Sequence, residues 1–152
     1  MKNNFYTIHE MELVYLPNYK IAEKPILKSS NSAYELLLQI YNPNTIRCQE
    51  EFIVMYLNNN GSVLGIQKLS KGGINGTVAD IRLILATALK SLATGLIISH
   101  NHPSGNIKPS ENDKNLTDKF YKACKSIEIK LLDHVIVTPD NGYFSFADEF
   151  LL

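Results

Sequence analysis

Two histidines and one aspartate stand close together between residues 99 and 113. His100 and His102 are separated by a single residue, and Asp113 follows after ten intervening residues. Two imidazoles and one carboxylate form the ligand set of a catalytic zinc site, which leaves the fourth tetrahedral position to water. A structural zinc site more often has four ligands with thiolates among them, and this segment contains no cysteine. The spacing therefore points to one catalytic metal ion.

The same residues also have purely structural interpretations. A His-x-His pair is a weak signal by itself, and Ser110 with Asp113 resembles a capping box that opens the next helix. The context favours a site, because residues 96–99 have the pattern of a short buried strand that ends where the histidines begin. Ligand sites of α/β proteins lie beyond the carboxyl ends of strands.

These residues carry a family resemblance. The pattern His-x-His-Pro, six residues, then Ser-x-x-Asp resembles the JAMM motif of the JAB/MPN zinc metallopeptidases. The sequence HNHPSG, together with LLDH at 131–134, is similar to the bacterial RadC branch of that family. The resemblance runs from about residue 20 to the C-terminus. It implies an α/β fold of the JAB/MPN (cytidine deaminase-like) type, a three-layer sandwich with a mixed central sheet.

The resemblance also implies a role for each residue of the motif. His100, His102 and Asp113 would hold one Zn²⁺ per chain, and Ser110 would donate a hydrogen bond to the reacting carbonyl oxygen. A glutamate on an earlier strand would act as the general base. The implied reaction is hydrolysis of a peptide or isopeptide bond in a protein substrate.

Two adjacent glutamates begin the predicted strand at residues 50–57. Side chains alternate along a strand, so Glu50 shares a face with Phe52 while Glu51 points the other way. The alternation alone does not choose between them. The Glu-x-Phe pattern of RadC-like sequences selects Glu50 as the base, and Glu51 is then expected to be a solvated charge.

Hydrophobic periodicity and turn residues predict the remaining elements. Residues 1–28 are expected to form an N-terminal arm or edge strand, with Met11–Tyr15 as its strand, and residues 29–152 a single JAB/MPN-type catalytic domain. In the first half, besides the strand at 50–57, we expect a helix that starts at Ser30 or Asn31 and is ended by Pro43, then an Asn-Gly hairpin with a returning strand at 62–70 and a glycine-rich link at 71–76. The next helix is capped by Thr77 and Asp80 and has Leu89 and Leu92 on its inner face. After the strand at 96–99, we expect a helix at 111–127, strands at 129–138 and 143–146, and a helical turn at 147–152.

Three further side chains receive structural interpretations. His134 is expected to pair with Asp133, in the core or behind the metal ligands, where such groups commonly orient them. Cys48 and Cys124 are expected to be small buried residues. Two isolated cysteines suit a reducing, cytoplasmic compartment.

Composition limits the classes of partner. Fifteen basic and fifteen acidic side chains cancel, so there is no overall charge that favours direct nucleic-acid binding, although a local patch stays open. The 152 residues suffice for one domain with its own core. The first residues lack an apolar signal region, and no run of 18 apolar residues occurs, so neither secretion nor membrane insertion is expected. The sequence does not indicate an oligomeric state.

Two other functions remain open at this stage. One is a DNA-repair or mobile-element module that acts without proteolysis, which rests on the historical association of the RadC name. The chain lacks the N-terminal helix-hairpin-helix region of long RadC proteins, which weakens that interpretation. The other is a zinc-stabilised interaction domain. Zinc deaminase chemistry is disfavoured, because its His-x-Glu and Pro-Cys-x-x-Cys signatures are absent.

Overall fold

A five-stranded sheet runs through the middle of the protein. The computed structural model describes residues 23–71, 79–140 and 142–152. The strands follow the spatial order β2-β1-β3-β4-β5, with only β3 and β4 parallel among the neighbouring pairs. Their bounds are β1 Glu51–Leu57, β2 Val63–Lys71, β3 Gly95–Asn101, β4 Lys130–Val137 and β5 Tyr143–Ser145. The predicted mixed sheet is confirmed.

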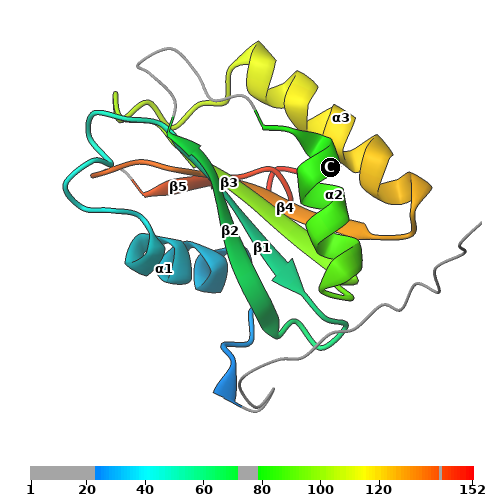
Figure 1. Cartoon of the computed structure of the whole chain (residues 1–152). Helices are drawn as coiled ribbons and strands as arrows, with labels where there is room; N and C mark the ends of the chain where they lie inside the picture. The colour runs from blue at the N-terminus through cyan, green and yellow to red at the C-terminus, as the bar shows by residue number, and fades with distance from the viewer. Residues whose placement is uncertain (1–22, 72–78, 141) are drawn as a thin grey trace, which may run out of the picture.

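Helices cover both faces of the sheet. Helix α1, Ser30–Ile40, lies on one face, and helices α2, Ile81–Lys90, and α3, Glu111–Ser126, lie on the other (Figure 1). Each face has its own apolar cluster. The α1 cluster includes Leu37 and Met55, whereas Phe120 of α3 packs against the opposite side of the sheet. This is the three-layer α/β sandwich that the sequence predicts, in agreement with a JAB/MPN-like fold.

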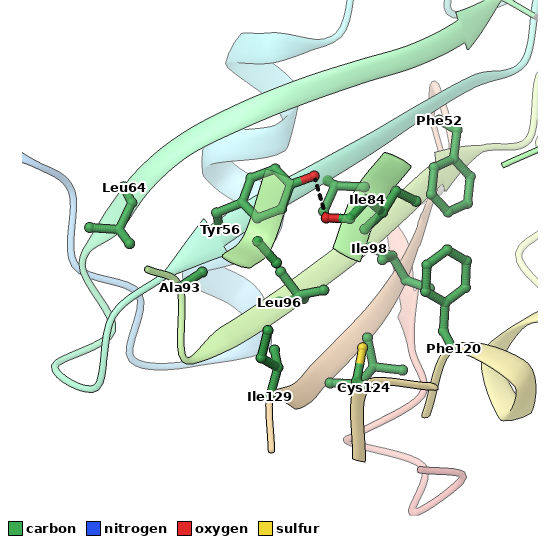
Figure 2. Packing of buried hydrophobic residues seen from close by; sticks show 13 residues of the cluster. Phe52, Tyr56, Leu64, Ile84, Ala93, Leu96, Ile98, Phe120, Cys124 and Ile129 are labelled. Atoms are coloured by element: carbon green, nitrogen blue, oxygen red, sulfur yellow. Dashed lines mark hydrogen bonds between the residues drawn. The ribbon is translucent and has the colours of Figure 1, made fainter. Parts of the chain in front are cut away.

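Strand β1 contributes to both clusters because it is an interior strand. All seven of its residues are buried, as its apolar character on both faces predicts. Phe52 and Val54 face α2 and α3, and Ile53 faces α1. Figure 2 shows Phe52 beside Phe120, whose ring centroids are 6.0 Å apart. This alternation decides which neighbouring polar residues can meet near α3.

A tight turn at Asn60-Gly61 joins β1 to β2, as predicted. Gly61 has a φ of +74°, in the left-handed region that favours glycine. A Cβ atom there would also lie 2.7 Å from the carbonyl oxygen of Leu27. The Leu27 backbone N–H donates to the Gly61 carbonyl at 2.9 Å. Gly61 therefore allows residues before α1 to pack closely against the hairpin.

Some predicted features differ from the structure. Helix α2 is capped by Asp80 and ends at Lys90. Leu89 in its last turn and Leu92 beyond its end are 52% and 55% exposed rather than packed inward. Cys124 is buried as predicted, but Cys48 is exposed. The helical turn predicted at 147–152 corresponds to turns at residues 146–150. The predicted strand Met11–Tyr15, the cap at Thr77 and residues 72–76 of the glycine-rich link lie outside the described residues.

None of the helices in the described ranges combines the length and the apolar character that a membrane span requires.

Candidate metal centre

The end of β3 and the start of α3 bring the predicted ligands together. His100 lies near the end of β3, and the backbone N–H of His102 continues the pairing with β4 by donating to the Val137 carbonyl at 2.9 Å. Asp113 lies in the first turn of α3, whose N-cap is Ser110. One ligand atom from each of His100, His102 and Asp113 lies within 4.8 Å of the others.

The three side chains present electron-rich atoms to one another. The Nε2 atoms of His100 and His102 are 3.0 Å apart, and they lie 3.2 and 3.5 Å from the carboxylate oxygens of Asp113. The Nδ1 of His102 is 2.7 Å from the carbonyl oxygen of Asn106. A carbonyl only accepts, so Nδ1 carries the hydrogen in a neutral ring and Nε2 offers a lone pair. Two imidazole nitrogens and a carboxylate this close can share one cation, and this donor set fits zinc.

The electrostatics of the two partly buried candidate ligands, His102 and Asp113, agree with a cation site. Desolvation lowers the pKa of His102, but the contact with Asp113, the hydrogen bond to the Asn106 carbonyl and the charges of Asp113 and Glu50 raise it above its usual value. Partial burial raises the pKa of Asp113, but the close contacts with His100 and His102 outweigh burial and hold that pKa well below its usual range. The carboxylate is therefore ionised at neutral pH.

Ser110 and Asp113 form the capping box, and their geometry is also compatible with the predicted ligand role of Asp113. Ser110 Oγ accepts from the Asp113 backbone N–H at 3.1 Å. Asp113 Oδ2 accepts from the Ser110 backbone N–H and from its hydroxyl, each at 2.7 Å. The other carboxylate oxygen, Oδ1, faces His100. The cap thus orients the carboxylate toward the histidines, and the helix N-terminus favours its negative charge.

Strand register places Glu50 on the same face as the three ligands. Phe52 pairs with His100 across the antiparallel β1–β3 ladder, and Glu50 precedes Phe52 by two residues. Glu50 is partly buried, and its charge contributes to the raised pKa of His102. Its position is the one expected of a base beside the metal ligands, whereas its catalytic role stays a prediction.

The expectation for Glu51 is wrong. Its side chain is only 2% exposed, and its carboxylate accepts a hydrogen bond from Thr45 Oγ1 at 2.7 Å. It points to the α1 face, away from the histidines, because it alternates with Phe52 along β1. The hydroxyl of Thr45, rather than water, donates a hydrogen bond to the Glu51 carboxylate.

Comparison with known proteins agrees with this geometry. The family model described as "RadC-like JAB domain" matches residues 27–151. The chain belongs to the RadC-like JAB domain family. It is 39% identical over 137 residues to a UPF0758 protein of Porphyromonas gingivalis, which covers 90% of this chain and 59% of the relative. It is 49% identical over 100 residues to a UPF0758 protein of Flavobacterium johnsoniae, which covers 66% of this chain and 43% of the relative.

A UPF0758 protein of Lactococcus lactis is 42% identical over 101 residues, with 66% of this chain and 44% of the relative covered. The chain spans about half the length of the curated relatives it matches. The fold and the family are thereby established for this RadC-like domain, and the group of two histidines and one aspartate fits the JAMM motif of the family.

Asn101 supports the RadC-like site from the opposite face, and sequence reasoning did not identify it. Its side-chain amide donates to the carbonyls of Ile46 and Gln49, at 2.8 and 2.9 Å. Its side-chain oxygen accepts from the Glu51 backbone N–H at 2.7 Å. The side chain is fully buried. Asn101 therefore fixes the segment that leads into Glu50 against the end of β3.

His134 lies behind His100 rather than beside Asp133, so the predicted pair is wrong. Asp133 instead accepts hydrogen bonds from Ser145 Oγ and the Ala147 backbone N–H, at 2.7 and 3.0 Å. The two ring nitrogens of His134 lie 2.8 Å from His100 Nδ1 and 2.6 Å from Thr117 Oγ1. Adjacent residues of a strand point to opposite faces, which explains the difference. Burial lowers the pKa of His134 well below its usual value.

Proposed function

We propose that this RadC-like domain is a zinc-dependent hydrolase that cleaves a peptide or isopeptide bond in a protein substrate. The observation that carries the proposal is the convergence of ligand atoms from His100, His102 and Asp113 within 4.8 Å. The position of Glu50 on the same face supports it. Two imidazoles and one carboxylate are the ligand number of a catalytic zinc site rather than a structural one.

His100, His102 and Asp113 would hold the ion, and Glu50 would move the proton. When bound, zinc supplies Lewis acidity that makes a hydroxide nucleophile available near neutral pH. Glu50 accepts the proton of the attacking water and later delivers it to the leaving amine. This role requires hydrogen-bond reach to both groups in the assembled site. The charge that Glu50 exerts on His102 supports that proximity.

Ser110 is proposed to donate a hydrogen bond to the carbonyl oxygen of the substrate. Its hydroxyl donates to Asp113 Oδ2 in the substrate-free geometry. On substrate binding, the O–H turns to the carbonyl oxygen, where negative charge develops. Asp113 Oδ2 then keeps the hydrogen bond from the Ser110 backbone N–H, so the carboxylate remains oriented while the hydroxyl is used.

A cytoplasmic setting is part of this proposal. Cys48 and Cys124 are free thiols, one exposed and one buried. Isolated free thiols suit a reducing compartment. The substrate is proposed as a protein chain, because the reaction consumes an amide bond and the motif resembles that of metallopeptidases.

Metal content is the direct test of the proposed site. The purified protein should retain about one zinc per chain after dialysis against a mild chelator, and His102→Ala should retain none, because two protein ligands hold zinc far less tightly than three. Elemental analysis of both proteins gives the result, with circular dichroism to verify folding. Retention of a full equivalent of zinc by His102→Ala would remove the ligand assignment. A wild type that binds no added zinc would remove the proposed function.

A further inference from the structure

Three hydrogen bonds, two of them buried and one partly buried, connect one candidate ligand to the backbone of another. His100 Nδ1 lies 2.8 Å from His134 Nε2, and His134 Nδ1 lies 2.6 Å from Thr117 Oγ1. The Thr117 hydroxyl donates to the carbonyl oxygen of Asp113 at 2.6 Å. The chain of contacts therefore starts at a ligand in β3, crosses β4 and returns to the first turn of α3. We refer to these contacts through His134 and Thr117 as the relay.

The last contact of the relay fixes the direction of the others. The carbonyl of Asp113 has no hydrogen, so Thr117 must donate to it. A hydroxyl has a single hydrogen, so Thr117 Oγ1 can only accept from His134 Nδ1–H. A neutral His134 then has a bare Nε2, which accepts from His100 Nδ1–H. By this order of donors, the Nε2 of His100 carries a lone pair and faces His102 and Asp113.

Burial makes the neutral form of His134 the appropriate one. The side chain is fully buried, and its ring stacks on Phe146 with centroids 4.7 Å apart and planes at 10°. Phe52 lies on another side of the ring, at 6.5 Å between centroids. A charged imidazolium among these aromatic rings would lose its hydration, and no carboxylate of the described residues contacts the ring, so the charged form is costly.

Reversing the relay would disable His100 as a ligand. If His134 donated from Nε2, His100 Nδ1 would accept, and the hydrogen of a neutral His100 ring would move to Nε2. That nitrogen points at His102 and Asp113, and a protonated nitrogen cannot bind a metal ion. The hydroxyl of Thr117 thus acts on the metal centre from two side chains away.

We propose that Thr117 and His134 are positioning residues, which hold His100 in the tautomer and orientation that bind the ion. This inference rests on the proposed function, because it concerns the metal that the function requires. It assigns roles to two residues outside the pattern His-x-His-Pro, six residues, Ser-x-x-Asp. Groups that orient metal ligands typically contribute about 10- to 100-fold in metal affinity.

The first test compares Thr117→Val with Thr117→Ser. Valine has nearly the same shape but no hydroxyl, whereas serine keeps the hydroxyl. Competition titrations with a chromophoric chelator should show zinc affinity lowered about 10- to 100-fold in Thr117→Val and nearly unchanged in Thr117→Ser. Tyr41→Phe is the control for stability alone, because it removes a buried hydrogen bond to Ser99 on the α1 face. That control should bind zinc as the wild type does.

The second test measures the tautomer directly in the metal-free protein. Nitrogen NMR of the imidazoles should find the hydrogen of His100 on Nδ1 in the wild type and shifted toward Nε2 in Thr117→Val. If Thr117→Val fails to fold, His134→Phe removes the acceptor of His100 Nδ1–H directly and keeps an aromatic ring stacked on Phe146. It should lose at least as much zinc affinity.

The outcomes separate the relay from the proposed function. Wild-type affinity in folded Thr117→Val and His134→Phe, with zinc bound to the wild type, would overturn the relay and leave the function intact. Absence of zinc binding by the wild type would overturn the function, and the NMR result would still decide the relay. An unchanged His100 tautomer in Thr117→Val would overturn it in either case.

Discussion

The two faces of the sheet carry similar polar side chains at the edge where β1 begins and β3 ends, but these side chains have different partners. On the α1 face, Glu51 accepts from Thr45 and Asn101 has three hydrogen bonds to its neighbours. Those groups form a closed network. On the α3 face, His100 and His102 direct their Nε2 atoms at each other, 3.0 Å apart. Those atoms are available to a cation.

The difference shows that residue type alone does not make a site. Each face has one of the two adjacent glutamates, and each has polar residues from the same strand. The α1 network pairs its donors with acceptors inside the protein, which stabilises the fold. On the α3 face, the Nδ1 atoms of His100 and His102 form hydrogen bonds to His134 and to the Asn106 carbonyl. Their Nε2 atoms face each other and Asp113, where no donor is required. The predictions below test whether chemistry is confined to that face.

The largest expected difference between the faces is between Glu50→Gln and Glu51→Gln. Glu50→Gln should retain zinc and fold but lose about 10²- to 10⁴-fold in turnover, because it removes the proton acceptor. Glu51→Gln should keep most of its turnover, since that side chain is bound to Thr45 on the other face. Cleavage of a mixed peptide library, followed by mass spectrometry, measures both. Equal losses in the two variants would contradict the assignment.

A smaller difference is expected between two helix caps. Ser110→Ala should lower turnover about 10²- to 10³-fold by removing one donor to the carbonyl oxygen. It should also cost about 1 kcal/mol of stability through the lost cap. Ser29 forms a similar capping box at the start of α1, so Ser29→Ala is the matched control.

The control should show a similar loss of stability by thermal unfolding with no effect on turnover. If Ser110→Ala and Ser29→Ala reduced turnover alike, Ser110 would have only a structural role.

The smallest expected effect is the pH dependence of zinc binding on the α3 face. Desolvation lowers the pKa of His102, but Asp113 and the Asn106 carbonyl raise it above the usual value near 6.5. The imidazole is neutral above that raised pKa and protonated below it, and only the neutral form binds metal. Zinc affinity should therefore be constant at high pH and fall about tenfold per pH unit below the raised pKa.

Chelator competition between pH 8.5 and 5.5 measures this dependence, with circular dichroism to show that the fold persists. A flat profile across that range would contradict the geometry of His102.

The fold was predictable where local residues decide it. Interior strand β1 follows from its apolar run, and the β1–β2 hairpin follows from Asn60-Gly61. Helix α1 begins at Ser30, in agreement with the predicted start at Ser30 or Asn31. The inward packing predicted for Leu89 and Leu92 is wrong: Leu89 is exposed within the last turn of α2, and Leu92 lies beyond the helix end at Lys90. The periodicity of apolar residues continues past that end.

The supporting residues of the site depend on contacts far apart in the sequence. His134 meets His100 across 34 positions, and Asn101 meets Gln49 across 52. No local pattern distinguishes His134 paired with Asp133 from His134 behind His100. By contrast, the ligand group lies within 14 residues, from His100 to Asp113, so its spacing could be read directly.

The shared use of Asp113 gives the centre a kinetic property. Its carboxylate is both the N3 partner of the α3 cap and the third side chain of the ligand group. Opening the first turn of α3 would withdraw that carboxylate and expose the ion to exchange. Under the proposed function, the lifetime of a bound ion would therefore depend on how often this helix end frays, and strengthening the cap would slow metal release without altering either histidine.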